Sequence, residues 1–139
     1  MNAPVCELCE PTGDIIVQRR DWRVVLVDDL HYPGFCRVIW NQHVKEMTDL
    51  TSGQRAELIN VVWQIEAAIR EVLAPHKVNV ASLGNVVPHL HWHVIPRFAD
   101  DVHFPNPIWG QIERSVNENL ATRRALLDTL KSAIRQRLT

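Results

Sequence analysis

Three histidines alternate with apolar residues in one stretch of this chain. His89, His91 and His93 are separated by Leu90 and Trp92. Alternation with a period of two is typical of a half-buried β-strand, on which every second side chain points to the same face. The spacing predicts a row of imidazoles whose neighbours lie roughly 6.5–7 Å apart. Such a row can attack a substrate, carry protons or bind a metal ion near neutral pH.

The row has three interpretations. A strand that shows polar side chains to solvent explains one histidine well, but it explains three in strict alternation poorly, since the whole chain has only 7. A metal site is the second interpretation, because two histidines separated by one residue on a strand can chelate one ion. Nucleophilic catalysis is the third, with one imidazole attacking while its neighbours tune it. The residue types alone leave the last two open.

Residues 89–95 fit the pattern His-φ-His-φ-His-φ-φ, where φ is apolar, and so resemble the histidine triad (HIT) superfamily. Residues 6–9 resemble the Cys-x-x-Cys near the start of many bacterial members, and residues 38–43 resemble their Val-Ile-Pro-Lys-x-His strand end. Residues 84–85, Gly-Asn, stand where many members have Gly-Gln. The resemblance spans residues 6–97 and does not reach the C-terminal part of the chain.

The resemblance implies a nucleotide hydrolase or transferase acting at the α-phosphorus. The middle histidine of the family attacks, which is His91 here, and water hydrolyses the resulting nucleotidyl-histidine. His89 and His93 would flank the phosphate oxygens and relay protons. We expect a purine nucleoside phosphoramidase. A dinucleoside polyphosphate hydrolase or a nucleotidyl transferase is the alternative, and a metal-binding or interaction module is the alternative from a different class. None of the enzymes implied needs a cofactor for the chemistry.

Four further residues match nucleotide-binding positions of the family. Asn79 and Asn85 lie where members have amide side chains that hold the phosphate or the leaving group. Asp29 and Leu30 match an Asp and a following apolar residue that line the ribose pocket. Each polar residue also has a structural interpretation: Asn79 as a strand end, Asn85 as a turn former and Asp29 as part of an ordinary turn.

Two positions depart from the family pattern. Many members have Gly-His where this chain has Gly34 and Phe35, and that histidine lies close to the triad in those proteins. The family's Ser or Thr two residues after the loop glycine is Val86 here. The chain therefore lacks one histidine and one phosphate-directed hydroxyl of the family's site.

The N-terminal cysteines suggest a zinc site. Cys6 and Cys9 alone are compatible with half a zinc site, a redox pair or two thiols that pack the N-terminal segment. A closed structural site needs two more ligands. Resemblance to zinc-binding HIT proteins supplies His43 and His89, so we expect these four residues to hold a structural zinc.

Composition limits the remaining possibilities. A length of 139 residues suits one domain, residues 1–139, and 46% hydrophobic residues are enough for a core. The net charge of −1 gives no general drive toward nucleic acid or membrane. No stretch approaches the ~20 apolar residues of a membrane span, and the first residues resemble no signal peptide. Three cysteines do not suit a disulfide framework, so a cytoplasmic location is expected.

Periodicity predicts an α+β fold. Strands are expected at residues 14–18, 22–27, 35–40 and 78–81 and through the triad, where Pro96 should end the ladder. A long helix should begin at Thr51, which has capping-box spacing to Gln54, and a C-terminal helix is expected over residues 112–138. We expect a mostly antiparallel sheet of about five strands carrying the long helix. The resemblance implies a homodimer with one continuous sheet.

The loop after the triad is proline-rich and aromatic. Residues 104–109 read Phe-Pro-Asn-Pro-Ile-Trp. Prolines restrict the backbone, so such a loop should cover another part of the protein. Trp109 has two interpretations: it lies near the triad and selects the leaving group, or it packs under the last helix.

Overall fold

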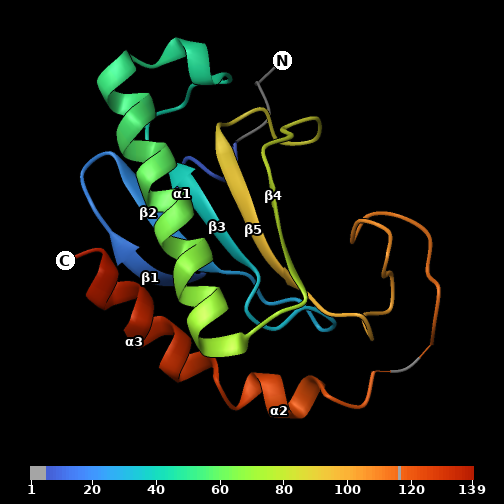
Figure 1. Ribbon diagram of the computed structural model, residues 1–139. Coiled ribbons are helices and arrows are strands. Elements are labelled where there is room, and N and C mark those ends of the chain that lie inside the picture. Colours follow the sequence, from blue (N-terminus) through green and yellow to red (C-terminus); the bar gives the residue numbers. More distant parts are fainter. Residues whose placement is uncertain (1–5, 116) are drawn as a thin grey trace.

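One antiparallel sheet of five strands organises the molecule. The computed structural model describes residues 6–115 and 117–139. The number of strands and their antiparallel pairing are as predicted for the α+β fold, and the strand order is β1-β2-β3-β5-β4 (Figure 1). The strands are β1 (Asp14–Gln18), β2 (Trp22–Leu26), β3 (Cys36–Trp40), β4 (Lys77–Ala81) and β5 (His91–Arg97). The helices are η1 (Met47–Asp49), α1 (Ser52–Leu73), α2 (Leu120–Arg124) and α3 (Leu127–Arg137).

The long helix α1 begins and ends where the sequence predicts. Thr51 is its N-cap: the Thr51 hydroxyl accepts from the Gln54 N–H at 3.2 Å, and the Gln54 side chain accepts from the Thr51 N–H at 2.9 Å. This reciprocal pair satisfies two N–H groups that the first turn leaves free. Ala74 ends the helix in the left-handed conformation, with φ 47°, directly before Pro75. None of the described helices is long and apolar enough to cross a membrane.

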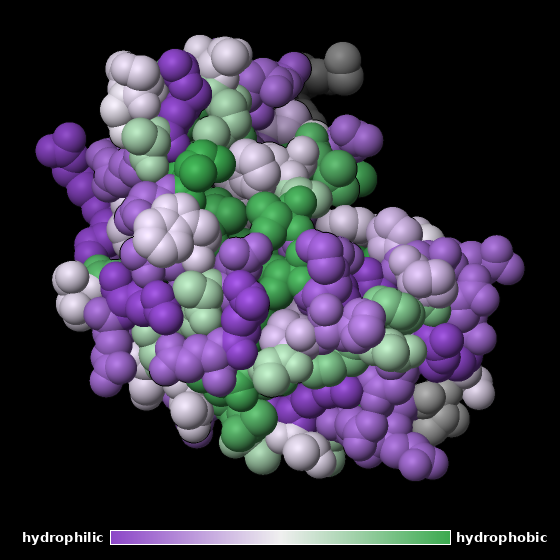
Figure 2. All heavy atoms as spheres, in the orientation of Figure 1, coloured by the Kyte–Doolittle hydropathy of each residue, from purple (hydrophilic) through white to green (hydrophobic). Residues whose placement is uncertain are grey.

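The two faces of the sheet have different roles. On one face the helices α1 and α3 pack over Val24, Val38 and Val94 of the central strands, all of which are fully buried (Figure 1). Directly paired residues share a face of a sheet, so the odd-numbered residues of β2, β3 and β5 point to the other face. His91 and His93 belong to this second face. Viewed from the α1 side, the surface is largely hydrophilic, with hydrophobic residues gathered near the centre (Figure 2).

Pro96 does not end the ladder as predicted. β5 continues through Pro96 to Arg97. The carbonyl of Leu90 accepts from the N–H of Trp40 on the β3 side, so the even-numbered residues of β5 direct their main-chain polar groups toward β3. β3 pairs with β5 only as far as Val94. The nitrogen of Pro96 therefore faces a position where no ladder bond is needed.

The predicted C-terminal helix over residues 112–138 is wrong in its first part. The described residues before position 120 form no helix there, and α2 and α3 follow. Asn119 donates to Asp100 at 2.6 Å, and Arg114 donates to the carbonyl of Phe104 at 2.8 Å. These tertiary contacts tie the segment to the loop after β5 and override its helical spacing.

Candidate active site

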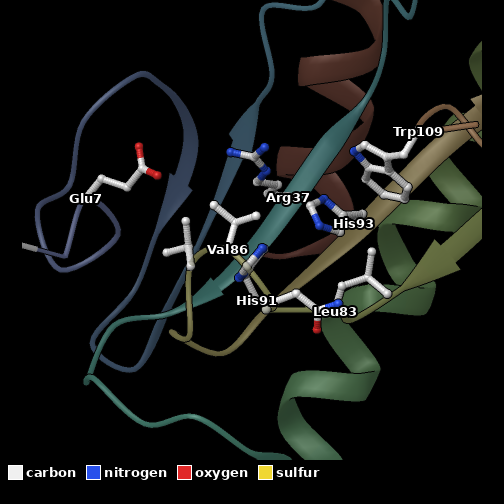
Figure 3. A pocket seen from close by; sticks show the side chains of 10 residues that line it. Glu7, Arg37, Leu83, Val86, His91, His93 and Trp109 are labelled. Atoms are coloured by element: carbon white, nitrogen blue, oxygen red, sulfur yellow. The ribbon is translucent and has the colours of Figure 1, made fainter.

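His91 and His93 line a cavity on the second face of the sheet. This triad cavity has a volume of about 400 Å³, and Arg37, Asn85 and Trp109 also line it (Figure 3). The two imidazole centroids are 4.8 Å apart at an interplanar angle of 83°, which is closer than strand spacing alone predicts. The site is therefore built by β3, β5, the two loops on either side of β5 and the N-terminal segment that carries Glu7.

The protonation of His91 is set by the main chain. Nδ1 of His91 lies 2.6 Å from the carbonyl oxygen of His89. A carbonyl oxygen only accepts, so Nδ1 carries the proton and Nε2 keeps its lone pair. Burial lowers the pKa of His91, while the bond to the His89 carbonyl opposes that shift. His91 is consequently a neutral imidazole near pH 7 with a nucleophilic Nε2.

His93 sits in a drier environment. It is 5% exposed, and burial, reinforced by the nearby His91 and Arg37, lowers its pKa to about 4. The ring of Phe35 meets His93 edge-on with centroids 5.6 Å apart. Nδ1 of His93 is buried and has no hydrogen-bond partner among the described residues. Phe35, where the family resemblance places a histidine, thus removes a polar neighbour of His93.

His89 faces a different site from the other two histidines. It precedes β5, and its Nε2 donates to the carbonyl of Trp40 at 2.5 Å. Its Nδ1 therefore carries a lone pair, and it points toward Cys6, Cys9 and His43. The side chain of His89 does not line the triad cavity, so only His91 and His93 of the predicted row face it.

The four predicted zinc ligands lie together. The ligand atoms of Cys6, Cys9, His43 and His89 are all within 4.8 Å of one another. Individual separations are 3.4 Å from Cys6 Sγ to His89 Nδ1, 3.4 Å from Cys9 Sγ to His43 Nδ1 and 3.2 Å between the two Nδ1 atoms. Ligands of a tetrahedral zinc, bonded at 2.0–2.3 Å, lie about 3.3–3.8 Å apart. The donor set and its spacing fit such an ion.

Three further cavities share walls with the triad cavity. The Asp28 cavity has about 270 Å³ and shares Glu7 and Arg37 with it. The Asn79 cavity has about 510 Å³ and shares Leu83 and Trp109 with it. Another, of about 280 Å³, shares Leu83, Gly84 and His91 with it. The triad, Asp28 and Asn79 cavities are the three that Arg37 or Trp109 lines.

The predicted nucleotide-binding residues are distributed unevenly over these spaces. Asn85 lines the triad cavity, and Asn79 lines the cavity named after it. Asp29 and Leu30 line none of the three; Asp29 accepts from the N–H of His31 at 2.9 Å, and Leu30 is 68% exposed. The neighbouring Asp28, which the sequence did not single out, lines the second cavity instead.

Trp109 lies at the triad and not under the last helix. Its ring centroid is 5.0 Å from that of His93, and the side chain is 54% exposed. Its loop is held by the buried Arg97, which donates to Asp101 at 3.0 Å, to the Asn106 carbonyl at 2.7 Å and to Asn79 at 2.7 Å. The bond to Asn79 means that Arg97 holds this predicted nucleotide-binding residue as well as the loop.

Two charged residues of the cavity were missed by sequence reasoning. Arg37 lies on β3 directly opposite His93, and Glu7 lies between the two N-terminal cysteines. The alternation of residues 36–40 already puts Arg37 and Ile39 on one face. The strand pairing that brings this face to the histidines is a long-range property, which no local pattern contains.

Comparison with known proteins identifies the family. Residues 10–100 match the family model described as HIT domain. The chain belongs to the HIT domain family. It is 34% identical over 127 residues to the AP-4-A phosphorylase of Mycobacterium tuberculosis, covering 84% of this chain and 65% of that protein. It is 28% identical over 95 residues to the bis(5'-nucleosyl)-tetraphosphatase [asymmetrical] of Schizosaccharomyces pombe, covering 65% of this chain and 52% of that protein.

This HIT chain thus spans between half and two thirds of the length of these curated relatives. Among solved structures it resembles the histidine triad protein blr8122 of Bradyrhizobium japonicum, with a TM-score of 0.71, 28% identity and 90% of each chain covered. This likeness, together with the family match, confirms the predicted HIT-like fold.

Proposed function

We propose that this HIT chain is a nucleotide hydrolase or transferase that attacks the α-phosphorus of dinucleoside polyphosphates with His91. The observation that carries this proposal is the tautomer of His91. His91 lines the triad cavity, and its Nδ1–H donates to the His89 carbonyl, so that Nε2 is free to attack. The names of the two curated relatives favour dinucleoside polyphosphates over the phosphoramidates expected first.

The reaction has two steps. Nε2 of His91 forms a bond to the α-phosphorus, and the bond from phosphorus to the bridging oxygen breaks, so the leaving phosphate chain takes the electron pair. An acceptor oxygen then attacks the same phosphorus and loses its proton, and the bond from Nε2 to phosphorus breaks. His93 is a neutral imidazole beside His91, and it relays the acceptor's proton.

The flanking cavities suit a substrate with two nucleoside ends. We assign one nucleoside to the Asp28 cavity, where the carboxylate of Asp28 can accept from ribose hydroxyls, in place of the predicted Asp29 and Leu30. The leaving nucleotide extends past Asn85 and Trp109 toward the Asn79 cavity. The phosphate chain between the two ends would cross the triad.

We also propose a structural zinc at Cys6, Cys9, His43 and His89. When bound, zinc supplies a crosslink between the N-terminal segment and the strands, not a reactive group. We further propose that the protein is a homodimer and that it is cytoplasmic. For the dimer, β4 is an edge strand whose outer side is unpaired among the described residues.

The experiment that tests this function uses diadenosine tetraphosphate, adenosine 5′-phosphoramidate and a nucleotide sugar as substrates. Attack at the α-phosphorus of diadenosine tetraphosphate releases ATP and leaves AMP on His91. Water as acceptor then yields AMP, whereas added inorganic phosphate yields ADP. His91→Ala should remove the adduct and lower turnover by roughly 10³-fold or more, as for other catalytic nucleophiles.

Peptide mapping of the trapped adduct decides the nucleophile. An adduct on another residue, or undiminished turnover in the variant, contradicts the assignment to His91. If the metal-binding or interaction module is the correct class, the wild-type protein forms no adduct with any of the three substrates. Loss of zinc along with turnover in His91→Ala would also favour that class.

A further inference from the structure

Arg37 is a charged residue of the triad cavity that the reaction above does not use. It projects from β3, and its main chain pairs directly with that of His93 on β5. Directly opposite residues have Cβ atoms about 4.5–5.5 Å apart, so the two side chains leave the sheet side by side. Figure 3 shows Arg37, His91 and His93 around one space.

The guanidinium of Arg37 has no hydrogen-bond or ion-pair partner among the described residues, although it lies over the Phe35 ring, 5.7 Å from its centroid. No hydrogen bond or ion pair involves it, and its Nε is buried and unsatisfied. The Nε of Arg23 on this face is also unsatisfied, but the rest of the Arg23 guanidinium donates to Asn41 at 2.8 Å and to the Leu8 carbonyl at 2.6 Å. Arg97 donates to three acceptors. A half-buried guanidinium without hydrogen-bond partners is costly unless a ligand satisfies it.

The position of Arg37 indicates which ligand group it serves. It lines both the triad cavity and the Asp28 cavity. An anion that lies between a nucleoside in the Asp28 cavity and Nε2 of His91 would contact the guanidinium of Arg37. The planar fork of N–H donors on a guanidinium matches two oxygens of a phosphoryl group.

We propose that Arg37 is a catalytic residue that donates to the non-bridging oxygens of the phosphoryl group attacked by His91. The inference rests on the proposed function and adds to it the group that stabilises the developing negative charge. The same charge helps to keep the histidines neutral, since burial first and Arg37 in addition lower the pKa of His91 and His93.

A structural role for Arg37 is the competing explanation. Glu7 lines the same cavity, and an ion pair between Glu7 and Arg37 would hold the N-terminal loop instead of a substrate. No such pair forms within 4.0 Å in the described residues. Glu7→Gln removes the carboxylate without touching Arg37, so it distinguishes the two roles.

The experiment compares Arg37→Gln, Arg37→Lys and Glu7→Gln with wild type, and uses the exposed Arg20→Gln as the charge-matched control. Single-turnover formation of the His91 adduct from diadenosine tetraphosphate is measured, together with the Kd of AMP. Arg37→Gln should slow adduct formation by about 10²–10³-fold, as for other donors to a developing anion. Arg37→Lys should recover only part of this loss, because a point charge does not replace the fork.

Sulfur substitution gives a readout that a merely structural role would not change. Replacing one non-bridging oxygen of the attacked phosphorus by sulfur should slow the wild type for one diastereomer, and Arg37→Gln should abolish that difference. Glu7→Gln and Arg20→Gln should keep it. The inference is overturned if Arg37→Gln reacts within about threefold of wild type, or if Glu7→Gln reproduces its loss.

The binding of AMP keeps the two proposals separate. Arg37→Gln should weaken AMP at least tenfold, and this holds whether or not the protein turns over a substrate. Equal AMP affinity in wild type and Arg37→Gln overturns the inference. Wild-type protein that binds AMP through Arg37 but forms no adduct refutes the proposed function alone. Should Arg37→Gln fail to fold, the sulfur effect and AMP affinity of Arg37→Lys decide.

Discussion

At the scale of single residues, the histidine row divides between two sites. Sequence alternation correctly predicts that His91 and His93 share a face. It does not reveal that His89 precedes the strand and turns its ring toward His43, with centroids 5.0 Å apart. Asp28, and not the predicted Asp29, lines the neighbouring cavity for a related reason: a shift of one residue at a strand end reverses the direction of a side chain.

His93 should make the protein sensitive to acid. Its pKa is about 4 in the folded chain and near 6.5 in the unfolded chain. Between these values the unfolded state binds more protons, so stability is complete above about pH 6.5 and falls as pH drops toward 4. The loss at pH 4.5 relative to pH 7 should be about 2 kcal/mol from this residue.

Urea unfolding at both pH values measures this loss. His93→Asn should show a smaller loss than wild type by that amount, whereas His76→Asn, which alters a histidine outside the triad cavity, should not. Equal pH dependence in wild type and His93→Asn would show that His93 is ordinarily solvated.

At the scale of elements, local signals define the strands and α1. The capping box at Thr51 and the β-branched residues of β1, β2 and β3 are local properties of the sequence, so these elements are predictable. The loop between β5 and α2 is different. The buried Arg97 holds this loop by donating to Asp101 and to the Asn106 carbonyl, and it also donates to Asn79, which is 18 residues away in the chain. Such contacts depend on tertiary structure and leave no periodic signal.

Trp109 should determine substrate preference and contribute little to stability. Because the side chain is 54% exposed, Trp109→Ala should cost far less than the roughly 3–5 kcal/mol of a buried aromatic truncation. Its contact with His93 and the Asn79 cavity should change the relative kcat/KM for diadenosine tetraphosphate and adenosine 5′-phosphoramidate.

Trp63 on α1 provides the matched control, since it is 50% exposed and lines none of the three cavities. Trp63→Ala should leave the ranking of substrates unchanged. A large stability loss in Trp109→Ala with an unchanged ranking would instead show that the tryptophan serves the fold.

At the scale of the whole molecule, one face of the sheet carries the core and the other carries the proposed active site. α1 and α3 cover the first face, and the fully buried Leu130 and Ile134 of α3 join that core. The second face contains Arg23, Arg37, His91 and Arg97, which are polar side chains on a largely buried sheet surface. The core and the proposed site thus lie on opposite sides of the same strands.

Removal of the metal should reduce stability more than activity. Cys9→Ser should lower the bound zinc and the Tm together, because a metal that binds only the folded chain stabilises it. Turnover at temperatures well below the Tm should stay close to that of wild type. The group that fixes the tautomer of His91 is the main-chain carbonyl of His89, and the main-chain hydrogen bonds of the adjacent Leu90 hold that carbonyl in place without the metal.

Metal analysis and thermal melting test this prediction. Cys36→Ala is the control: that thiol is fully buried, burial raises its pKa to about 12, and it lies outside the cluster, so zinc should be retained. A Cys9→Ser protein with an unchanged Tm, or a wild type purified without metal, would exclude a structural zinc.

The division of labour within His89 has an evolutionary consequence. Its imidazole belongs to the cysteine cluster, whereas its carbonyl oxygen orients His91, the proposed nucleophile. A carbonyl is present whatever amino acid occupies the position. A lineage descended from this chain can therefore lose its thiols and this imidazole, one substitution at a time, while His91 keeps its tautomer. In such descendants, a row with two histidines in place of three would indicate that the metal site is lost. It would not indicate that activity is lost.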